Sequence, residues 1–227
     1  MTGKATGFAL LLTLLSPAGG TDAHRCATGP AVVSADAEGA PDVVCRAARE
    51  AATRLAACGL VARRPVSVRV VRDLGDECPP HALGYYDART QEVIVPTYNV
   101  CVRLAGPDGR FGVALSPEMY RSLIVHELTH AITHQLVHPR KLERTAYEYV
   151  AYAIQFTAMD PEVSAQILRQ QGIDGPVGVR DLSDTYFSLS PARFAVKAYL
   201  HFRDPANGCG FLHDVIAGRV KLPVGHR

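Results

Sequence analysis

Four histidines occur at every fourth position in the stretch LIVHELTHAITHQLVH, which covers residues 123–138. They are His126, His130, His134 and His138. Four residues advance an α-helix by about 400°, so neighbours in this row lie on one face, one turn apart. Because imidazole is the commonest metal ligand among side chains, the row is a candidate metal site.

The first part of the row, residues 126–130, has the pattern H-E-x-x-H. On a helix, imidazoles at positions i and i+4 can converge on one zinc ion, and the glutamate between them points to the adjacent water position. The pattern therefore predicts His126 and His130 as ligands and Glu127 as the general base of a metal-assisted hydrolysis. The alternative is a set of structural histidines with hydrogen-bond partners in the fold.

The second half of the row does not fit the same ion. His134 lies about 6 Å beyond His130 along the helix axis, out of reach of an ion held between the first two histidines. We interpret His134 as a surface or cleft-wall residue and His138 as a cation near the negative end of the helix dipole. A catalytic zinc site has three protein ligands and keeps one position for water, so the third ligand must come from another segment.

Two glutamates in the next predicted helix, Glu143 and Glu148, are candidates for the third ligand. Their separation of five residues corresponds to about 140° around a helix, so both cannot face the same ion. Glu143 sits among basic residues near the helix start, where a solvated acid is ordinary. Glu148 lies in the apolar segment TAYEYVAYAIQF, where an unpaired charge would be costly to bury. The sequence favours Glu148 and leaves Glu143 as its rival.

The wider pattern distinguishes between two families of zinc peptidases. The metzincins extend the motif to H-E-x-x-H-x-x-G-x-x-H, but Thr133 and Leu136 occupy the places of that glycine and histidine. The chain instead resembles the gluzincins, zinc peptidases whose third ligand is a glutamate on the following helix. The segment EYVAY, residues 148–152, is similar to their E-x-x-A-[D] segment and lies 18 residues after His130. The resemblance covers about residues 84–156.

This resemblance implies a zincin-like fold and one catalytic Zn2+ ion held by His126, His130 and Glu148. Glu127 would then be the base in the hydrolysis of peptide bonds. Tyr152 stands where many gluzincins have an aspartate that hydrogen-bonds a ligand histidine, so its hydroxyl is a candidate for that contact. Such enzymes usually take an oxyanion donor from a tyrosine, histidine or arginine elsewhere in the chain. The candidates here are Tyr186, Tyr199 and His201.

A peptide or protein substrate would bind in an extended conformation along an edge strand. The segment QEVIVP is a candidate for that strand, and a plain hairpin strand is the alternative. Its candidate residues are Gln91, Glu92, Val93, Ile94 and Val95. The 227-residue chain is 48% hydrophobic and 20% charged with a formal net charge of +2, so we expect neither a nucleic acid nor a membrane surface as partner. We assume a monomer.

The first 23 residues have the pattern of a signal peptide. Lys4 precedes the apolar run FALLLTLL, and small residues follow up to Ala23, after which we expect cleavage. The run is far shorter than the roughly 20 residues that span a bilayer. We therefore expect an exported bacterial protein, secreted or periplasmic. All six cysteines lie beyond the cleavage site, which favours disulfides. The preferred pair is Cys78–Cys101, which flanks the predicted hairpin.

The remaining patterns predict the elements that position these residues. Residues 24–41 are rich in glycine, proline and alanine and are expected to form a flexible lead-in to a single domain, 42–227. That domain should begin with an amphipathic helix at 42–59 and continue with a small sheet. The sheet strands are predicted at residues 65–73 and 84–96.

The second part of the domain is predicted to be helical. Ser116-Pro117-Glu118 is a helix start, and Pro139 ends this histidine-bearing helix near Val137. The fold class that follows is α+β and helix-rich, with a C-terminal helical lobe. The further helices are predicted at residues 143–159, 162–171, 190–204 and 211–217.

The leading hypothesis is therefore an exported, single-domain, gluzincin-like zinc peptidase. Two hypotheses from other classes remain open. The first is a catalytically inactive zincin-like domain that binds zinc as an interaction module; the intact Glu127 argues against it, because a ligand-only site has no need of a base. The second is a disulfide-stabilised binding domain whose histidines merely lie on its surface.

Replacement of the two candidate glutamates should identify the third ligand. We expect Glu148→Ala to lose bound metal, because it removes a ligand, whereas Glu143→Ala should keep it. Metal analysis of the purified proteins measures both. The reverse result would make Glu143 the third ligand. Clearly less than one zinc ion per chain in the untreated parent protein would favour surface histidines.

Overall fold

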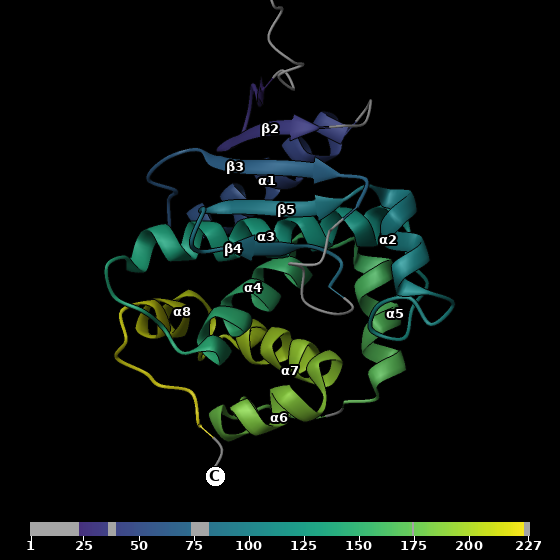
Figure 1. Ribbon diagram of the computed structural model, residues 1–227. Coiled ribbons are helices and arrows are strands. Elements are labelled where there is room, and N and C mark those ends of the chain that lie inside the picture. Colours follow the sequence, from purple (N-terminus) through teal and green to yellow (C-terminus); the bar gives the residue numbers. More distant parts are fainter. Residues whose placement is uncertain (1–22, 36–39, 74–81, 174, 225–227) are drawn as a thin grey trace, which may run out of the picture.

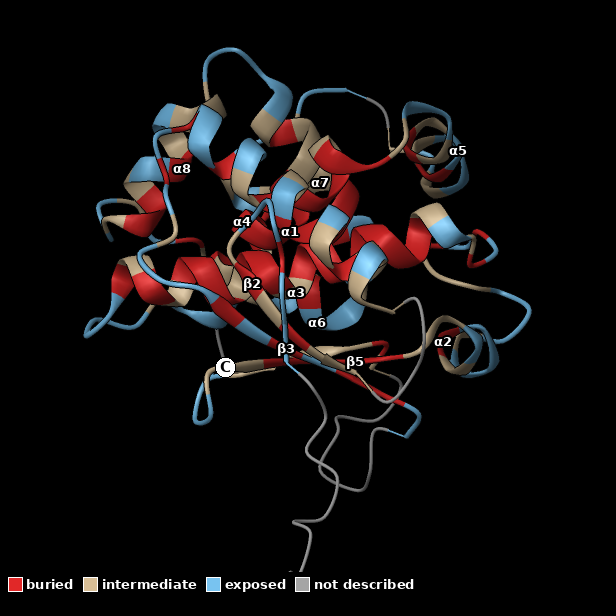
Figure 2. Cartoon of the chain, turned by 90° about the horizontal axis from the view of Figure 1, so that it is seen from above, coloured by how far each residue is buried: buried red, intermediate tan, exposed pale blue. Residues whose placement is uncertain are grey.

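The computed structural model describes residues 23–35, 40–73, 82–173 and 175–224. Within these residues the protein consists of a five-stranded mixed sheet and eight α-helices. Figure 1 shows the sheet as one layer, and Figure 2 shows most of the helices gathered on one of its faces. The fold class predicted from the sequence, α+β and helix-rich, is confirmed.

The sheet has the strand order β1-β2-β3-β5-β4. Its three central strands are parallel, and each outer strand is antiparallel to its neighbour. Helix α1 (Ala40–Ala57) connects β2 to β3 and packs against β2, as a parallel pair requires a crossover connection. The strands are β1 (His24–Arg25), β2 (Ala31–Ala35), β3 (Val66–Val71), β4 (Tyr85–Asp87) and β5 (Glu92–Pro96).

The stretch 24–41, expected to be a flexible lead-in, instead contributes two strands, β1 and β2. Ala31 and Val33 alternate with less buried residues and belong to the hydrophobic core. Five residues with only this short alternation are hard to recognise in a glycine- and proline-rich context. The strand is stabilised by its parallel pairing with β3, which no local pattern reveals.

The predicted substrate edge strand, Gln91 to Val95, also needs correction. Gln91 precedes β5, and β5 lies inside the sheet, where Val93 pairs with Val68 on one side and Tyr86 on the other. Its nearly continuous burial is typical of an interior parallel strand rather than of an edge. The outer strand on this side of the sheet is β4.

The histidine-bearing helix is α3 (Pro117–Val137), within the limits predicted from the sequence. The Ser116 hydroxyl accepts a hydrogen bond from the Met119 N–H at 3.1 Å, and Pro117 stands in the first turn. The helix packs against the sheet, α1 and α4, so most of its side chains are buried. α3 therefore carries the H-E-x-x-H segment into the junction between the layers.

The C-terminal half is helical, as predicted, and packs against α3 mainly through α4. Helix α2, which connects β5 to the loop before α3, was not foreseen; its eight residues are too few for a clear periodic signal. The other helices are α2 (Tyr98–Ala105), α4 (Arg144–Ala158), α5 (Pro161–Gln171), α6 (Asp184–Leu189), α7 (Pro191–Arg203) and α8 (Gly208–Ile216), with a 3-10 turn at Val179–Asp181.

Two disulfides, Cys26–Cys45 and Cys58–Cys209, connect distant parts of the chain. They are consistent with a secreted protein. The expected Cys78–Cys101 pair is not supported, because Cys101 is a buried free thiol, and Cys78 lies outside the described residues. The predicted signal segment lies almost wholly outside them as well.

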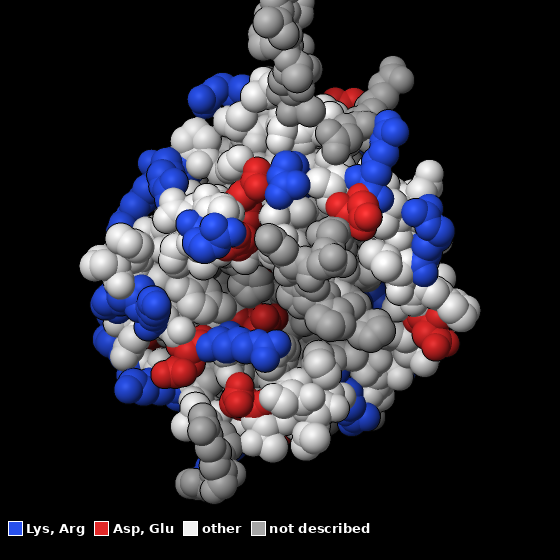
Figure 3. Space-filling model, in the orientation of Figure 1, with Lys and Arg blue, Asp and Glu red and all other residues white. Residues whose placement is uncertain are grey.

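The described surface carries both signs of charge. Lys and Arg side chains alternate with Asp and Glu side chains around a hollow in the centre of the face shown in Figure 3. No helix in the described part of the chain is long and apolar enough to cross a membrane.

The two disulfides should stabilise the fold to different extents. The half-cystines are 151 residues apart in Cys58–Cys209 and 19 residues apart in Cys26–Cys45. In the chain-entropy description, the longer loop contributes about 2 kcal/mol more. We expect replacement of Cys58 and Cys209 by serine to lower the free energy of unfolding in urea. The loss should be larger by that amount than the loss caused by replacement of Cys26 and Cys45. Equal losses would show that strain or local contacts outweigh loop length.

Candidate metal centre

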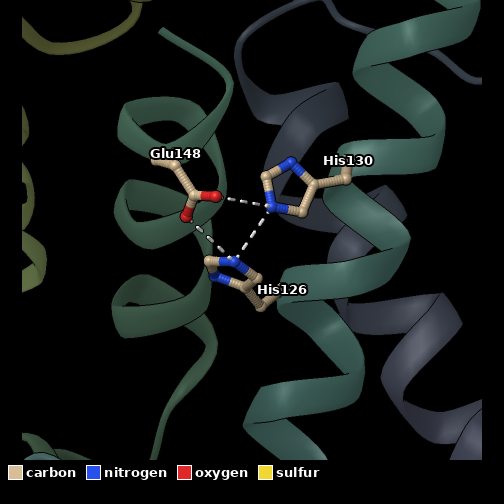
Figure 4. A group of neighbouring side chains, drawn as sticks. All are labelled: His126, His130 and Glu148. Carbon is tan, nitrogen blue, oxygen red and sulfur yellow. Dashed lines mark hydrogen bonds and ion pairs between the residues drawn. The ribbon is translucent and has the colours of Figure 1, made fainter. Parts of the chain in front are cut away.

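Helices α3 and α4 bring three side chains together. His126 and His130 point from α3 toward Glu148 on α4 (Figure 4). The two Nε2 atoms are 3.0 Å apart. Glu148 Oε2 lies 3.5 Å from His126 Nε2, and Glu148 Oε1 lies 3.8 Å from His130 Nε2. One ligand atom from each residue lies within 4.8 Å of the other two, so the cluster could hold a metal ion.

The donor set fits an ion of the zinc type. Two ligands that bind at about 2.0–2.1 Å in a tetrahedral arrangement are about 3.3 Å apart, close to the separations in this cluster. Two imidazole nitrogens and one carboxylate oxygen are also a common ligand set of catalytic zinc. The rival ligand Glu143 is exposed at the N-cap of α4 and is not part of the cluster.

The charge states of the cluster suit metal binding. Burial lowers the pKa of His130 to about 4, so its imidazole is neutral at neutral pH. Burial acts to raise the pKa of Glu148, but its contact with His126 and the positive charge of Arg144 outweigh this and hold that pKa below its usual range. A neutral imidazole and an ionised carboxylate are the forms that bind a metal ion.

Gln155 orients the first histidine. Its Oε1 atom lies 3.0 Å from His126 Nδ1, and its Nε2 atom donates to the Ser122 hydroxyl at 3.1 Å. The Ser122 hydroxyl donates in turn to the Met119 carbonyl at 2.7 Å. An amide oxygen can only accept, so this contact assigns the proton of His126 to Nδ1 and leaves the Nε2 lone pair directed at the cluster.

This contact of Gln155 replaces the one expected from Tyr152. The Tyr152 ring packs against the His126 ring with 4.5 Å between centroids, and its hydroxyl accepts a long hydrogen bond of 3.5 Å from Arg110 Nη2. Sequence reasoning missed Gln155. The available signal was its position seven residues after Glu148, two turns further on the same face of α4.

Glu127 lies beside the cluster and is half-buried. Burial raises the pKa of Glu127 to about 7, and the negative Glu148 adds to this, while His126 acts in the opposite direction. The chain that leads into β4 passes directly over it: a Cβ atom on Gly84 would lie 3.4 Å from Glu127 Cγ. With such a pKa the carboxyl group can both take up and release a proton near neutral pH.

The cluster and Glu127 open into a pocket of about 750 Å³. This is within the usual size range of ligand pockets. β4 and α4 form much of its wall, and His134 lines it, which agrees with its interpretation as a cleft-wall residue. His134 Nδ1 lies 2.7 Å from the Tyr86 hydroxyl, whose pKa burial raises to about 12. Tyr86 is therefore neutral and can act as a hydrogen-bond donor.

The three expected oxyanion donors lie away from the pocket. The Tyr186 hydroxyl accepts from Arg193 Nε at 3.2 Å, and Tyr199 stacks near Phe156. His201 is buried, with its Nδ1 atom 3.0 Å from the Tyr149 hydroxyl. None of these three lines the pocket. The polar side chains that do so, apart from the cluster and Glu127, include Tyr86, Arg110, Tyr147 and Tyr152.

The sequence profile of DUF6639, described as a family of unknown function, matches residues 31–224. The chain belongs to DUF6639. The matched span runs from β2 past α8. The candidate metal cluster, Glu127 and Gln155 therefore all lie within the residues that match the family. No curated protein and no solved structure matches the chain.

Gln155 should affect metal affinity without being a ligand. Gln155→Leu removes the acceptor for His126 Nδ1, and such outer contacts typically change metal affinity by about 10- to 100-fold. Gln155→Glu keeps an acceptor at the same place and should retain most of the affinity. Competition with a chromophoric chelator measures both, and thermal unfolding shows whether each variant is folded. Unchanged affinity in a folded Gln155→Leu protein would exclude this role.

Proposed function

We propose that the protein is an exported zinc-dependent peptidase with a gluzincin-like site. The observation that carries the proposal is the placement of a half-buried carboxyl group, Glu127, beside a His126–His130–Glu148 cluster in one pocket. A cluster that only binds metal has no need of such a group. The two disulfides and the signal-peptide pattern of the first 23 residues are both consistent with export.

The division of roles follows from the donor chemistry. His126, His130 and Glu148 would hold the ion. A zinc ion bound there would lower the pKa of a water molecule to about 7 and polarise a carbonyl group. Glu127 would take the proton of the attacking water and deliver it to the leaving amine. Burial acts to raise the pKa of Glu127, which favours both transfers, because the same group must act first as a base and then as an acid.

The position of β4 would allow an extended peptide to bind beside it. This outer strand lies along the pocket, and its residues Tyr85 and Tyr86 line the pocket wall. A substrate that adds to the sheet at this edge would run past Glu127, because the chain entering β4 crosses that residue. The neutral Tyr86 hydroxyl would then be a candidate donor to the oxyanion, in place of the three residues expected from the sequence.

Glu127→Gln tests the proposal. The amide cannot accept the proton of the water, so we expect the variant to keep its metal but to lose hydrolysis of a denatured protein by about 100- to 10,000-fold. Metal analysis and release of labelled fragments measure the two properties. Glu162→Gln, an exposed change in the first turn of α5, is the matched control and should behave as the parent.

The outcomes separate the functional classes. Equal activity of Glu127→Gln and the parent would exclude the peptidase mechanism. A parent protein that binds one zinc ion and hydrolyses no peptide bond would point to a non-catalytic zinc-binding module.

A further inference from the structure

Three basic side chains line the same pocket as the two carboxylates: Arg110, Lys141 and Arg144. Glu148 belongs to the metal cluster, and Glu127 lies beside it. None of the three cations forms an ion pair within the described part of the chain. In Figure 3 both basic and acidic side chains border the hollow at the centre of the face shown. A divalent ion in the cluster would add two more positive charges, so the pocket has a surplus of positive charge.

Arg110 differs from the other two cations because it lies deeper. Lys141 and Arg144 are exposed residues at the rim, whereas Arg110 is partly buried. Its Nε atom is shielded from solvent and has no hydrogen-bond partner among the described residues. Its Nη2 atom makes only the 3.5 Å contact with the Tyr152 hydroxyl. A guanidinium group carries five N–H donors, and leaving the shielded Nε–H without a partner is costly.

The surrounding contacts hold this guanidinium group in place. The backbone of Arg110 exchanges two hydrogen bonds with Val113, at 2.9 and 3.1 Å. The guanidinium carbon lies 5.1 Å from the centre of the Phe111 ring, which itself contacts the Tyr152 and Phe156 rings of α4. Because Tyr152 packs on His126, the group is fixed one side chain away from the metal cluster. A donor fixed in this way loses little entropy on binding.

The electrostatic contacts agree with this position. The positive charge of Arg110 acts to lower the pKa of Glu127 and of Tyr152, against the larger effect of their burial. Arg110 is therefore close enough to the base and to the pocket wall to act on a molecule bound between them.

We propose that the pocket selects substrates that carry a carboxylate close to the scissile bond and that Arg110 binds this carboxylate. Two parallel N–H···O bonds are the geometry in which a guanidinium and a carboxylate match. The inference rests on the proposed peptidase function, because it defines the substrate class of that same site. The carboxylate can come from an acidic side chain or from the C-terminus of the peptide.

Binding to metal-loaded Glu127→Gln protein tests this proposal without turnover. Three peptides of equal length are compared by calorimetry. One contains glutamate and a free C-terminus, the second has glutamine in place of the glutamate, and the third has an amidated C-terminus. We expect the first to bind roughly 10- to 100-fold more tightly than one of the others, since hydrogen bonds to charged groups have this effect. The peptide that loses affinity identifies the source of the carboxylate.

The residue is tested by adding Arg110→Gln, which should abolish the difference between the peptides. Arg110→Lys keeps the charge without the paired donors and should reduce the difference. Arg169→Gln, an exposed change in the last turn of α5, is the matched control and should preserve it. Metal content and thermal unfolding show whether each variant is folded. If Arg110→Gln is unfolded, the Arg110→Lys variant decides.

The inference is overturned if the three peptides bind equally, if none binds, or if a folded Arg110→Gln protein keeps the preference. Failure of the peptidase proposal looks different. If the protein prefers the carboxylate peptides but its parent form cleaves none of them, the carboxylate site is supported and the peptidase proposal is contradicted. If the protein cleaves neutral and acidic peptides at the same rate, the peptidase proposal is supported and the inferred carboxylate preference is contradicted.

Discussion

The burial of α3 is the constraint on which the rest of the structure depends. This helix packs against the sheet, α1 and α4 at once, so most of its side chains lie in the interior. Polar side chains in that position need partners. Arg121 meets this need through an ion pair with Glu50 on α1. His126 and His130 meet it differently, because their Nε2 atoms face each other and the carboxylate of Glu148. The interior therefore contains two imidazole nitrogens and a carboxylate close together, an arrangement that a bound cation would stabilise.

Such a cluster connects metal binding with folding. Its ligands are neighbours only when α3 and α4 are packed together, so an ion that binds there stabilises the folded chain relative to the unfolded one. Part of the geometry is held by contacts that do not involve the ion. The chain of hydrogen bonds from His126 through Gln155 to Ser122 is internal to the two helices and holds the imidazole in its orientation. The ion would then meet a partly organised site, and the entropy lost on binding would be smaller.

The sequence predicted those parts of the site that depend on helical periodicity and on the cost of burying charge. His126 and His130 share a face by spacing, and Glu148 was preferred because its surroundings are apolar. The parts that depend on contacts between distant segments were not predictable in this way. Arg110 belongs to a loop whose position relative to α4 no local pattern encodes. The same holds for β5, whose neighbours on both sides come from strands that only the folded sheet brings together.

Under the proposed function, reaction and recognition are carried by different kinds of structure. The proposed metal ligands and the proposed base come from α3 and α4, where close packing allows little change of geometry. Residues assigned to recognition come from the outer strand β4, the loop before α3 and the start of α4. Those segments lie at the surface, where substitutions and insertions are better tolerated. A change at Arg110 or at the rim lysine Lys141 would alter the charge that the pocket accepts, while the distance between Glu127 and the cluster would stay the same. Under the proposed function, substrate preference can therefore change without a change of mechanism.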